Sequence, residues 1–277
     1  MTAPRIAFIG GGNMARSLIG GLLRTGTSPS DIVAADPDEG QRSTLAGLGV
    51  AATASNAEAI RGARVVVLAV KPQVLPEAVR SMRFGDGQLV VSIAAGVPLA
   101  AIARWCGRSL PLVRCMPNTP ALYGAAITVL CANEHTEPHD RELATSVLRA
   151  AGTTLWVEDE ALLDAVTAVS GSGPAYFFYL MEAMIDAGTT LGLDAATART
   201  LTFETARGAA IMASQSEDAL HELRRNVTSP GGTTERAIAV LDAARVQAAM
   251  RRAVVAAAER SRELASDLEG PSDKEGS

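Results

Sequence analysis

The sequence has few aromatic residues, few histidines and no cluster of basic residues. Phe, Trp and Tyr together make up 4% of the 277 residues, and three histidines are present. With a formal net charge of −5 and no stripe of Lys and Arg, a nucleic-acid partner is not expected. No group of Cys, His and carboxylate residues has the spacing of a zinc site, so we expect no metal. The apolar runs are too short or too polar to span a bilayer, so no membrane partner is expected.

The three cysteines, Cys106, Cys115 and Cys131, lie in or beside apolar segments. An odd number of cysteines, without a CxxC pair and without a secretory leader, favours reduced thiols in a cytoplasmic protein. We therefore interpret all three as buried structural residues. The first strand pattern begins by Arg5, so no targeting peptide is expected before it.

The first half of the chain alternates short apolar runs with helical patterns. The β-branched run at residues 64–70 is typical of a strand buried on both faces. Strands are predicted near residues 5–9, 31–37, 64–70, 87–97, 110–117, 124–132 and 153–159. Helices are predicted from the first glycine turn to Gly26 and near residues 39–49, 55–63, 71–82, 99–107 and 140–152. This alternation predicts an α/β fold of the Rossmann type, with a doubly wound, mainly parallel sheet covered by helices on both faces.

The pattern changes near Glu160, after which no convincing strand occurs up to Leu268. Helices are predicted near residues 160–169, 174–191, 195–214, 217–226, 233–242 and 245–266. We therefore predict an α/β domain at residues 1–159, an all-α domain at 160–268 and a disordered tail at 269–277. No Gly/Ser-rich linker marks the boundary, so the helix that follows it is expected to pack on the first domain.

The helical half is apolar over much of its predicted surface. Residues 174–192 are apolar around most of the helix, and the alanines of residues 244–264 form a broad face. Such helices need a covering surface, so we expect a homodimer formed through this domain. A self-contained bundle is the alternative.

A glycine-rich loop follows the first strand. Gly10, Gly12 and Ala15 match the pattern G-x-G-x-x-G/A at the junction of a strand and a helix. In that pattern the first glycine permits the tight turn, the second lets a pyrophosphate approach the backbone, and the small third residue lets the helix lie close to the sheet. The helix N-terminus then faces the phosphates. The loop predicts a dinucleotide site, and a purely structural glycine turn is the alternative.

Asp36 ends the second predicted strand, 24 positions after Gly12. A carboxylate there would bond the ribose hydroxyls and repel a 2′-phosphate, which favours NAD(H). Arg42 is near enough in sequence to neutralise such a phosphate instead. Asp36 could also simply begin the Asp-Pro turn.

Three further strand ends carry small or polar residues. Lys71 in Ala69–Gln73 is a plausible cofactor contact, or else a solvated lysine before a turn. The small residues of Ser92–Val97 would let a flat nicotinamide ring lie against the backbone. Met116–Pro120 forms a rigid polar turn that suggests the same crevice. Ligands of open α/β sheets bind at the carboxyl ends of the strands, so these segments are expected to converge.

Two segments of the helical half carry hydroxyl residues and glycines directly before a predicted helix. Ser170 and Ser172 precede a helix from Pro174, and residues 228–234 precede another. Each is a candidate site for a small anion such as a carboxylate. Ordinary N-capping is the alternative, although one hydroxyl suffices for a cap.

Six motifs together resemble those of the pyrroline-5-carboxylate reductase family. They are FIGGGNMA, AVKP, SIAAGV, RCMPNTPA, SGSGPAY and NVTSPGGTT, in this order and spacing, and the similarity runs from about residue 5 to residue 265. The resemblance implies a Rossmann domain joined to a helical domain that forms a dimer, with assembly into larger rings such as a decamer. It also implies an active site built across the dimer.

The resemblance assigns site residues to this chain. Cofactor-binding positions are implied at Ile9, Gly10, Gly11, Gly12, Asn13, Met14, Asp36, Asn56, Ala69, Val70, Lys71, Pro72, Ala95, Gly96, Val97 and Asn226. Substrate-binding positions are implied at Ser229, Gly231, Gly232, Thr233 and Thr234. Many members of the family have a neutral residue where Asp36 stands and prefer NADPH, so the choice between NADPH and NADH stays open.

The implied reaction is hydride transfer to the C=N bond of 1-pyrroline-5-carboxylate, giving L-proline. A protonated imine needs little acid–base catalysis, which agrees with His135 and His139 at expected surface positions and His221 in a polar helix. We expect the Thr234 hydroxyl to hydrogen-bond the ring nitrogen as the catalytic contact, and the backbone N–H groups of Gly232 and Thr233 to bind the carboxylate.

Two other functions share part of this pattern. A related imine reductase or hydroxyacid dehydrogenase would usually place a lysine on the first long helix after the Rossmann domain, where this chain has Glu182 and Asp186. A non-catalytic NAD(P)-binding sensor would keep the first loop but would not need SPGGTT.

Overall fold

The computed structural model describes residues 5–269, with side chains described up to Leu264. The chain forms two compact units: unit 1 comprises the residues up to Ser172 and those from Ala257 onward, and unit 2 is Gly173–Ala256. Residues 160–172 thus pack with the sheet, as the missing linker led us to expect. The domain boundary at 159/160 stays a prediction, and residues 270–277 of the predicted tail lie outside the described residues.

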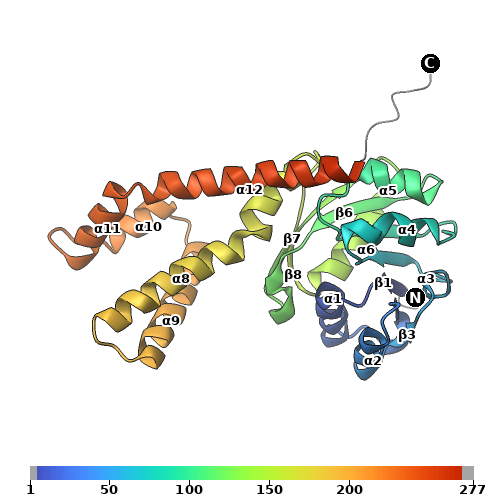
Figure 1. Cartoon of the computed structure of the whole chain (residues 1–277), viewed down its shortest axis with the longest axis horizontal. Coiled ribbons are helices and arrows are strands. Elements are labelled where there is room, and N and C mark those ends of the chain that lie inside the picture. The colour runs from blue at the N-terminus through green and yellow to red at the C-terminus, as the bar shows by residue number, and fades with distance from the viewer. Residues whose placement is uncertain (1–4, 270–277) are drawn as a thin grey trace, which may run out of the picture. The chain divides into compact units, whose positions relative to one another are not determined.

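Unit 1 contains an eight-stranded sheet in the order β3-β2-β1-β4-β5-β6-β7-β8. Figure 1 labels several of these strands. The strands are β1 Ile6–Ile9, β2 Ile32–Ala35, β3 Ala51–Thr53, β4 Val65–Leu68, β5 Leu89–Ser92, β6 Leu112–Met116, β7 Ala126–Ala132 and β8 Gly152–Trp156. Every neighbouring pair is parallel except β6 and β7. The predicted Rossmann-type, mainly parallel sheet is confirmed.

Helices cover both faces of this sheet, as alternate residues along its strands show. In β1, Ile6 and Phe8 belong to one buried apolar cluster, whereas Ala7 and Ile9 belong to the other. The first cluster includes residues of α1 (Asn13–Arg24), α2 (Glu39–Gly47) and α6 (Pro138–Arg149). The second includes residues of α3 (Asn56–Ala59), α4 (Leu75–Arg80), α5 (Leu99–Cys106) and α7 (Leu162–Val166). Burial on both faces explains why the central strands read as continuous apolar runs.

Two local elements differ from the sequence prediction. The edge strand β3 was missed, because its three residues, Ala-Ala-Thr, are partly exposed and are ordered by pairing with β2. The predicted helix at residues 71–82 is a 3₁₀ turn, Pro72–Val74, followed by α4. Further 3₁₀ turns lie at Pro29–Asp31 and Thr119–Tyr123.

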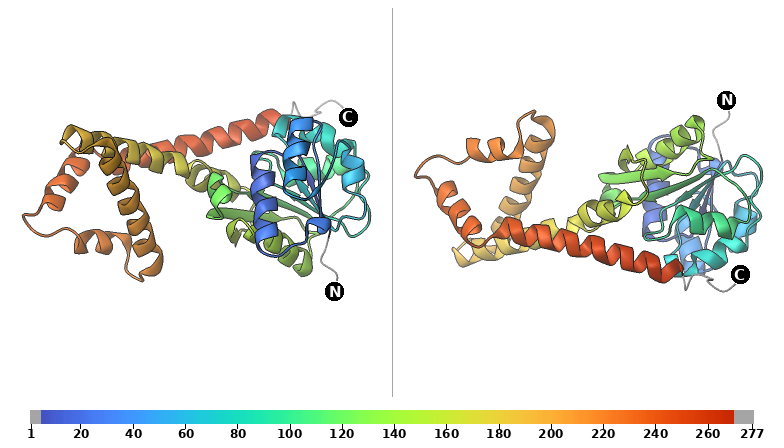
Figure 2. Two further views of the ribbon diagram at one scale, coloured as in Figure 1. Left: turned by 90° about the horizontal axis from the view of Figure 1, so that it is seen from below. Right: turned by 90° about the horizontal axis from the view of Figure 1, so that it is seen from above.

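Unit 2 is helical. Its helices are α8 Gly173–Thr190, α9 Ala195–Gln215, α10 Leu220–Asn226 and α11 Thr233–Ala243, followed by the first part of α12, Val246–Glu269. Figure 2 shows α12 as one continuous helix, whose residues from Ala257 onward belong to unit 1. Large apolar side chains of unit 2 are exposed in a single chain, among them Phe177, Phe178, Tyr179, Met184 and Phe203.

Candidate functional site

The glycine-rich loop joins β1 to α1, and its two key glycines differ in what they require. Gly10 has φ +102°, and a Cβ atom there would lie 2.6 Å from the carbonyl oxygen of Ala69, so the fold itself demands glycine. Gly12 is the N-cap of α1 with φ −67°, which any residue adopts, and a Cβ atom there would meet only open space. Ala15 is buried against the sheet. The loop therefore leaves space at the N-terminus of α1, as a pyrophosphate site requires.

Asp36 lies directly after β2 and is hydrogen-bonded to this loop. Its Oδ2 accepts a hydrogen bond from the Gly11 N–H at 2.7 Å, and its Oδ1 accepts one from the Asp38 N–H at 2.9 Å. Arg42 Nη1 donates to the carbonyl oxygens of Asp36 and Pro37, at 2.9 and 2.7 Å. The Asp36 carboxylate thus bonds both its own turn, at Asp38, and the glycine-rich loop, at Gly11. The Arg42 guanidinium is held beside it by the two backbone carbonyls.

A cavity of about 310 Å³ opens beside the loop, and we call it the Asn56 pocket. Its lining brings together Gly10, Asn56 and Val70, which the sequence placed on the cofactor. Ala35, Pro37, Val74, Glu77, Ala78 and Ser81 complete it. The carboxyl ends of β1, β2 and β4 therefore meet at one hollow, as expected for a doubly wound sheet.

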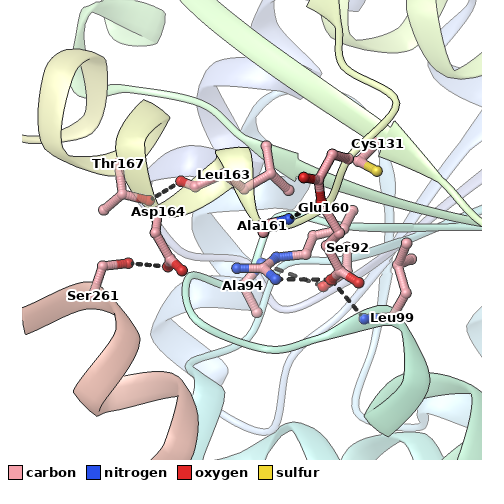
Figure 3. Close-up of polar contacts among 12 residues, drawn as sticks. Ser92, Ala94, Leu99, Cys131, Glu160, Ala161, Leu163, Asp164, Thr167 and Ser261 are labelled. Atoms are coloured by element: carbon pink, nitrogen blue, oxygen red, sulfur yellow. Dashed lines mark hydrogen bonds and ion pairs between the residues drawn. The ribbon is translucent and has the colours of Figure 1, made fainter. Parts of the chain in front are cut away.

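A second cavity of about 630 Å³ lies at the end of β5, and we call it the Gly96 pocket. It is lined by Pro72, Gln73, Ala95, Gly96, Thr167, Ser172, Ala257, Arg260, Ser261 and Leu264. The sequence identified Pro72, Ala95 and Gly96, but missed the wall formed by Thr167 and the end of α12. Ser261, a buried serine, donates a hydrogen bond to Asp164 at 2.7 Å, which fixes that wall (Figure 3). A serine within an alanine-rich helix carries too little signal to reveal this role.

Other predicted cofactor residues occupy different surroundings. Ile9 and Val97 are fully buried in the core, so only their backbones remain for a ligand. Asn13 and Lys71 are exposed, and Gly11, Met14 and Ala69 lie in or beside the loop region. Asn226, the last residue of α10 in unit 2, is exposed.

The first hydroxyl-rich segment is not a free helix N-terminus, which corrects the sequence interpretation. Residues Thr167–Gly171 form a π-helical turn between α7 and α8. The Ser170 hydroxyl donates to the Val166 carbonyl at 2.9 Å, and the Ser172 N–H donates to the Thr167 carbonyl at 2.8 Å. These groups are satisfied within the helix, so they form no anion site. Ser172 still lines the Gly96 pocket.

Asn118 supports this π-helical turn through its side-chain amide. Its side-chain nitrogen donates to the Ser170 carbonyl at 3.1 Å, and its oxygen accepts from the Ile127 N–H at 3.1 Å. The residue is 9% exposed. The Asn118 amide thus both donates and accepts within the protein, and the convergence of Met116–Pro120 on the crevice stays a prediction.

The second hydroxyl-rich segment lies between α10 and α11 in unit 2, and we call residues 227–232 the Gly231 turn. Gly231 has φ +71°, which favours glycine. The Gly232 N–H donates to the Ser229 carbonyl at 3.0 Å, so it is not free to bind a carboxylate as expected. The N–H groups of Thr233 and Thr234, in the first turn of α11, have no intrahelical acceptor and remain suited to an anion. Thr234 is half-buried and Ser229 and Thr233 are exposed.

Glu235 also takes part in the Gly231 turn, which the sequence did not suggest. Its Oε2 accepts a hydrogen bond from the Gly231 N–H at 2.8 Å. A carboxylate at a helix N-terminus is electrostatically favourable.

The cysteines and histidines offer no nucleophile or metal site. Burial raises the pKa of Cys106 to about 12, and burial raises the pKa of the Cys115 and Cys131 thiols as well, so none forms a thiolate at neutral pH. His135, His139 and His221 are exposed. Among the described residues, no group of His, Cys, Asp and Glu could hold a metal ion, and no helix is long and apolar enough to cross a membrane.

Comparison with known proteins gives matches over most of the chain. Residues 160–264 match the family "Pyrroline-5-carboxylate reductase dimerisation", and residues 5–96 match "NADP oxidoreductase coenzyme F420-dependent". The pyrroline-5-carboxylate reductase of Pseudomonas aeruginosa is 52% identical over 97% of this chain and 99% of its own, and that of Haemophilus influenzae is 43% identical over 94% and 97%. The solved structure of the Coxiella burnetii pyrroline-5-carboxylate reductase aligns with a TM-score of 0.90 at 40% identity, covering 95% of this chain and 99% of that one. The chain therefore belongs to the pyrroline-5-carboxylate reductase family.

Proposed function

We propose that this protein reduces the C=N bond of 1-pyrroline-5-carboxylate with a nicotinamide dinucleotide and releases L-proline, the last step of proline synthesis. The lining of the Gly96 pocket carries the proposal. Among its residues, Arg260 is the only one with a charged side chain, and it forms an ion pair with Glu263; no carboxyl, histidine or thiol group lines the cavity. Such a pocket suits a substrate that brings its own proton on the imine nitrogen and needs no general acid.

Each part of the chain would have a defined task in this reaction. The N–H groups at the N-terminus of α1, directly after Gly12, would hold the pyrophosphate, and Ala95 and Gly96 would let a flat ring lie against the backbone. The dinucleotide, when bound, supplies the hydride. The Thr234 hydroxyl would accept a hydrogen bond from the protonated ring nitrogen, and the Thr233 and Thr234 N–H groups would bind the substrate carboxylate. Ser229, Gly231 and Gly232 would shape that turn.

For the cofactor, we propose a preference for NADH with NADPH accepted. Two hydrogen bonds hold the Asp36 carboxylate at the end of β2, so it cannot move away from a 2′-phosphate without losing both. Arg42 offsets part of this repulsion, because its guanidinium is bound beside Asp36. Asn56 would lie beside the adenosine, and Val70 and Lys71 would contact the cofactor along its length. Asn226 would support the site.

The match to a dimerisation family supports self-association. We propose a cytoplasmic homodimer formed through the exposed apolar side chains of unit 2, with further assembly into a ring such as a decamer. We also propose that the Gly231 turn of one subunit completes the catalytic site served by the Gly10–Gly12 loop of another.

Cofactor oxidation tests the proposed reaction directly. Adding 1-pyrroline-5-carboxylate to the purified protein with NADH should lower the absorbance of the dihydronicotinamide. The amount of L-proline formed should equal the amount of NADH oxidised. We expect a higher kcat/KM with NADH than with NADPH. No proline with either cofactor would exclude the reaction, whereas a preference for NADPH would overturn only the role given to Asp36.

A further inference from the structure

Glu160 lies outside the Gly96 pocket but is bonded to the segment that forms one of its walls. Its Oε1 accepts a hydrogen bond from the Leu99 N–H at 2.8 Å, and it accepts another from Arg114 Nη1, also at 2.8 Å. Figure 3 shows the Glu160 carboxylate beside the Leu99 backbone nitrogen. Leu99 is the first residue of α5, and its N-cap, Pro98, makes no side-chain capping bond. A carboxylate from 61 residues away in the sequence thus caps this helix.

The capped helix end is also the end of the loop that carries Ala95 and Gly96. At its start, the loop is fixed by the sheet, because the Ile93 N–H donates to the Leu68 carbonyl at 3.1 Å. Within the loop, Gly96 has φ +74° and lines the pocket, and Ala95 is exposed there. The Glu160 bond to Leu99 is the polar anchor at the far end, where Val97 and Leu99 add apolar burial.

Arg114 explains why this anchor is held in a defined position. Arg114 is on β6 and is 7% exposed, and its side chain pairs with Glu160 alone among the carboxylates of the described residues. A buried guanidinium needs a hydrogen-bonded partner, so it fixes the carboxylate in one place. The sheet therefore sets the position of Glu160, and Glu160 sets the position of the loop end.

We propose that Glu160 is a positioning residue for the nicotinamide end of the cofactor, acting through Leu99 and the loop Ile93–Pro98. The proposal rests on the proposed function, because it assumes that this loop borders the nicotinamide ring. It predicts that loss of Glu160 weakens binding of the nicotinamide half of the dinucleotide and leaves the adenosine half unaffected. A role in stability alone would not separate the two halves.

The test compares NADH with ADP-ribose, which lacks the nicotinamide ring, as ligands of the folded protein without substrate. For Glu160→Ala we expect the Kd of NADH to rise by roughly tenfold, as for loss of one hydrogen bond to a charged group, with the Kd of ADP-ribose unchanged. Glu160→Gln keeps an acceptor for the Leu99 N–H and should restore NADH binding to within about threefold. The matched control is Glu158→Ala, because Glu158 is an exposed neighbour that pairs with Arg141 and should leave both constants unchanged.

A double variant guards against loss of folding, because Glu160→Ala leaves the buried Arg114 without its partner. Arg114→Met combined with Glu160→Met removes both charges and still lacks the cap on Leu99, so it should fold and show the same selective loss of NADH affinity. Wild-type NADH affinity in a folded variant without the carboxylate, or a parallel rise in both dissociation constants, would overturn the proposal. So would a chain that folds only when Glu160 is present, because that outcome assigns the residue to stability alone. These binding constants are independent of turnover, so a wild-type protein that binds NADH but forms no proline would refute the proposed reaction and leave this inference standing.

Discussion

Replacing Gly12 with aspartate is expected to raise the Kd for NADH and NADPH by at least about 100-fold while the protein stays folded. Space around Gly12 is open, its φ of −67° suits any residue, and aspartate is a favoured N-cap, so the substitution should not harm α1. The new carboxylate would lie where the pyrophosphate must approach the backbone. Two like charges about 4 Å apart near a protein surface repel by roughly 4 kcal/mol at an effective dielectric constant of 20. That energy is roughly a thousandfold in Kd, which exceeds the 100-fold lower bound expected here.

Two other glycines provide the comparison. Gly20→Asp makes the same change later in α1, where the nearest atom to a new Cβ is Arg24 Nη1 at 3.5 Å, and it should leave dinucleotide binding unchanged. Gly10→Ala should instead lower the melting temperature, since its Cβ would lie 2.6 Å from the Ala69 carbonyl. Fluorescence titration and thermal unfolding measure both effects. Normal affinity in the Gly12 variant would show that the pyrophosphate does not bind at this loop.

Replacing Thr234 with alanine is expected to lower kcat by about 10- to 1000-fold, the range for loss of one well-placed hydrogen bond in a transition state. Thr234 is half-buried in the first turn of α11, so removal of its hydroxyl leaves the helix intact. The Kd for NADH should not change, because Thr234 is assigned to the substrate. Thr234→Ser keeps the hydroxyl and should retain most of the activity.

Steady-state kinetics with 1-pyrroline-5-carboxylate give the decisive values for Thr234. A control is Thr200→Ala, whose hydroxyl is exposed on α9 and bonds only the Ala196 carbonyl. Full turnover in the Thr234→Ala protein would remove this hydroxyl from the mechanism. Equal losses in the serine and alanine variants would assign the effect to the shape of the turn.

The parts of the fold and site that could be predicted from the sequence depend on local rules. Position 10 requires a positive φ next to a buried strand, and glycine at this place in the motif indicates that requirement. The central strands were predicted because burial on both faces selects continuous apolar residues, as in β4. The edge strand β3 lacks that signal, since its order comes from β2 and not from its own three residues.

The parts that were missed depend on contacts between distant residues. Ser170 and Ser172 looked like an anion site at a helix N-terminus because Gly and Ser before Pro174 usually begin a helix. The chain instead continues through a π-helical turn supported by Asn118, two residues after β6. Ser261 lines the Gly96 pocket and bonds Asp164, which is 97 residues away in the sequence. Glu160 bonds Leu99 at the end of the pocket's loop, 61 residues away. The hydrogen bond between Glu235 and the Gly231 N–H is local in sequence. It was missed because a glutamate at the third position of a helix usually indicates only an ordinary capping box.

Co-expression of Gly12→Asp and Thr234→Ala chains tests most directly whether the glycine loop and the Gly231 turn serve one reaction across subunits. Each variant alone should have little activity. If subunits pair at random and each site takes its loop from one chain and its turn from another, about a quarter of the sites are intact, and the mixture should recover about a quarter of wild-type activity. A mixture no more active than its parents would contradict the account, because the two regions would then not meet between subunits.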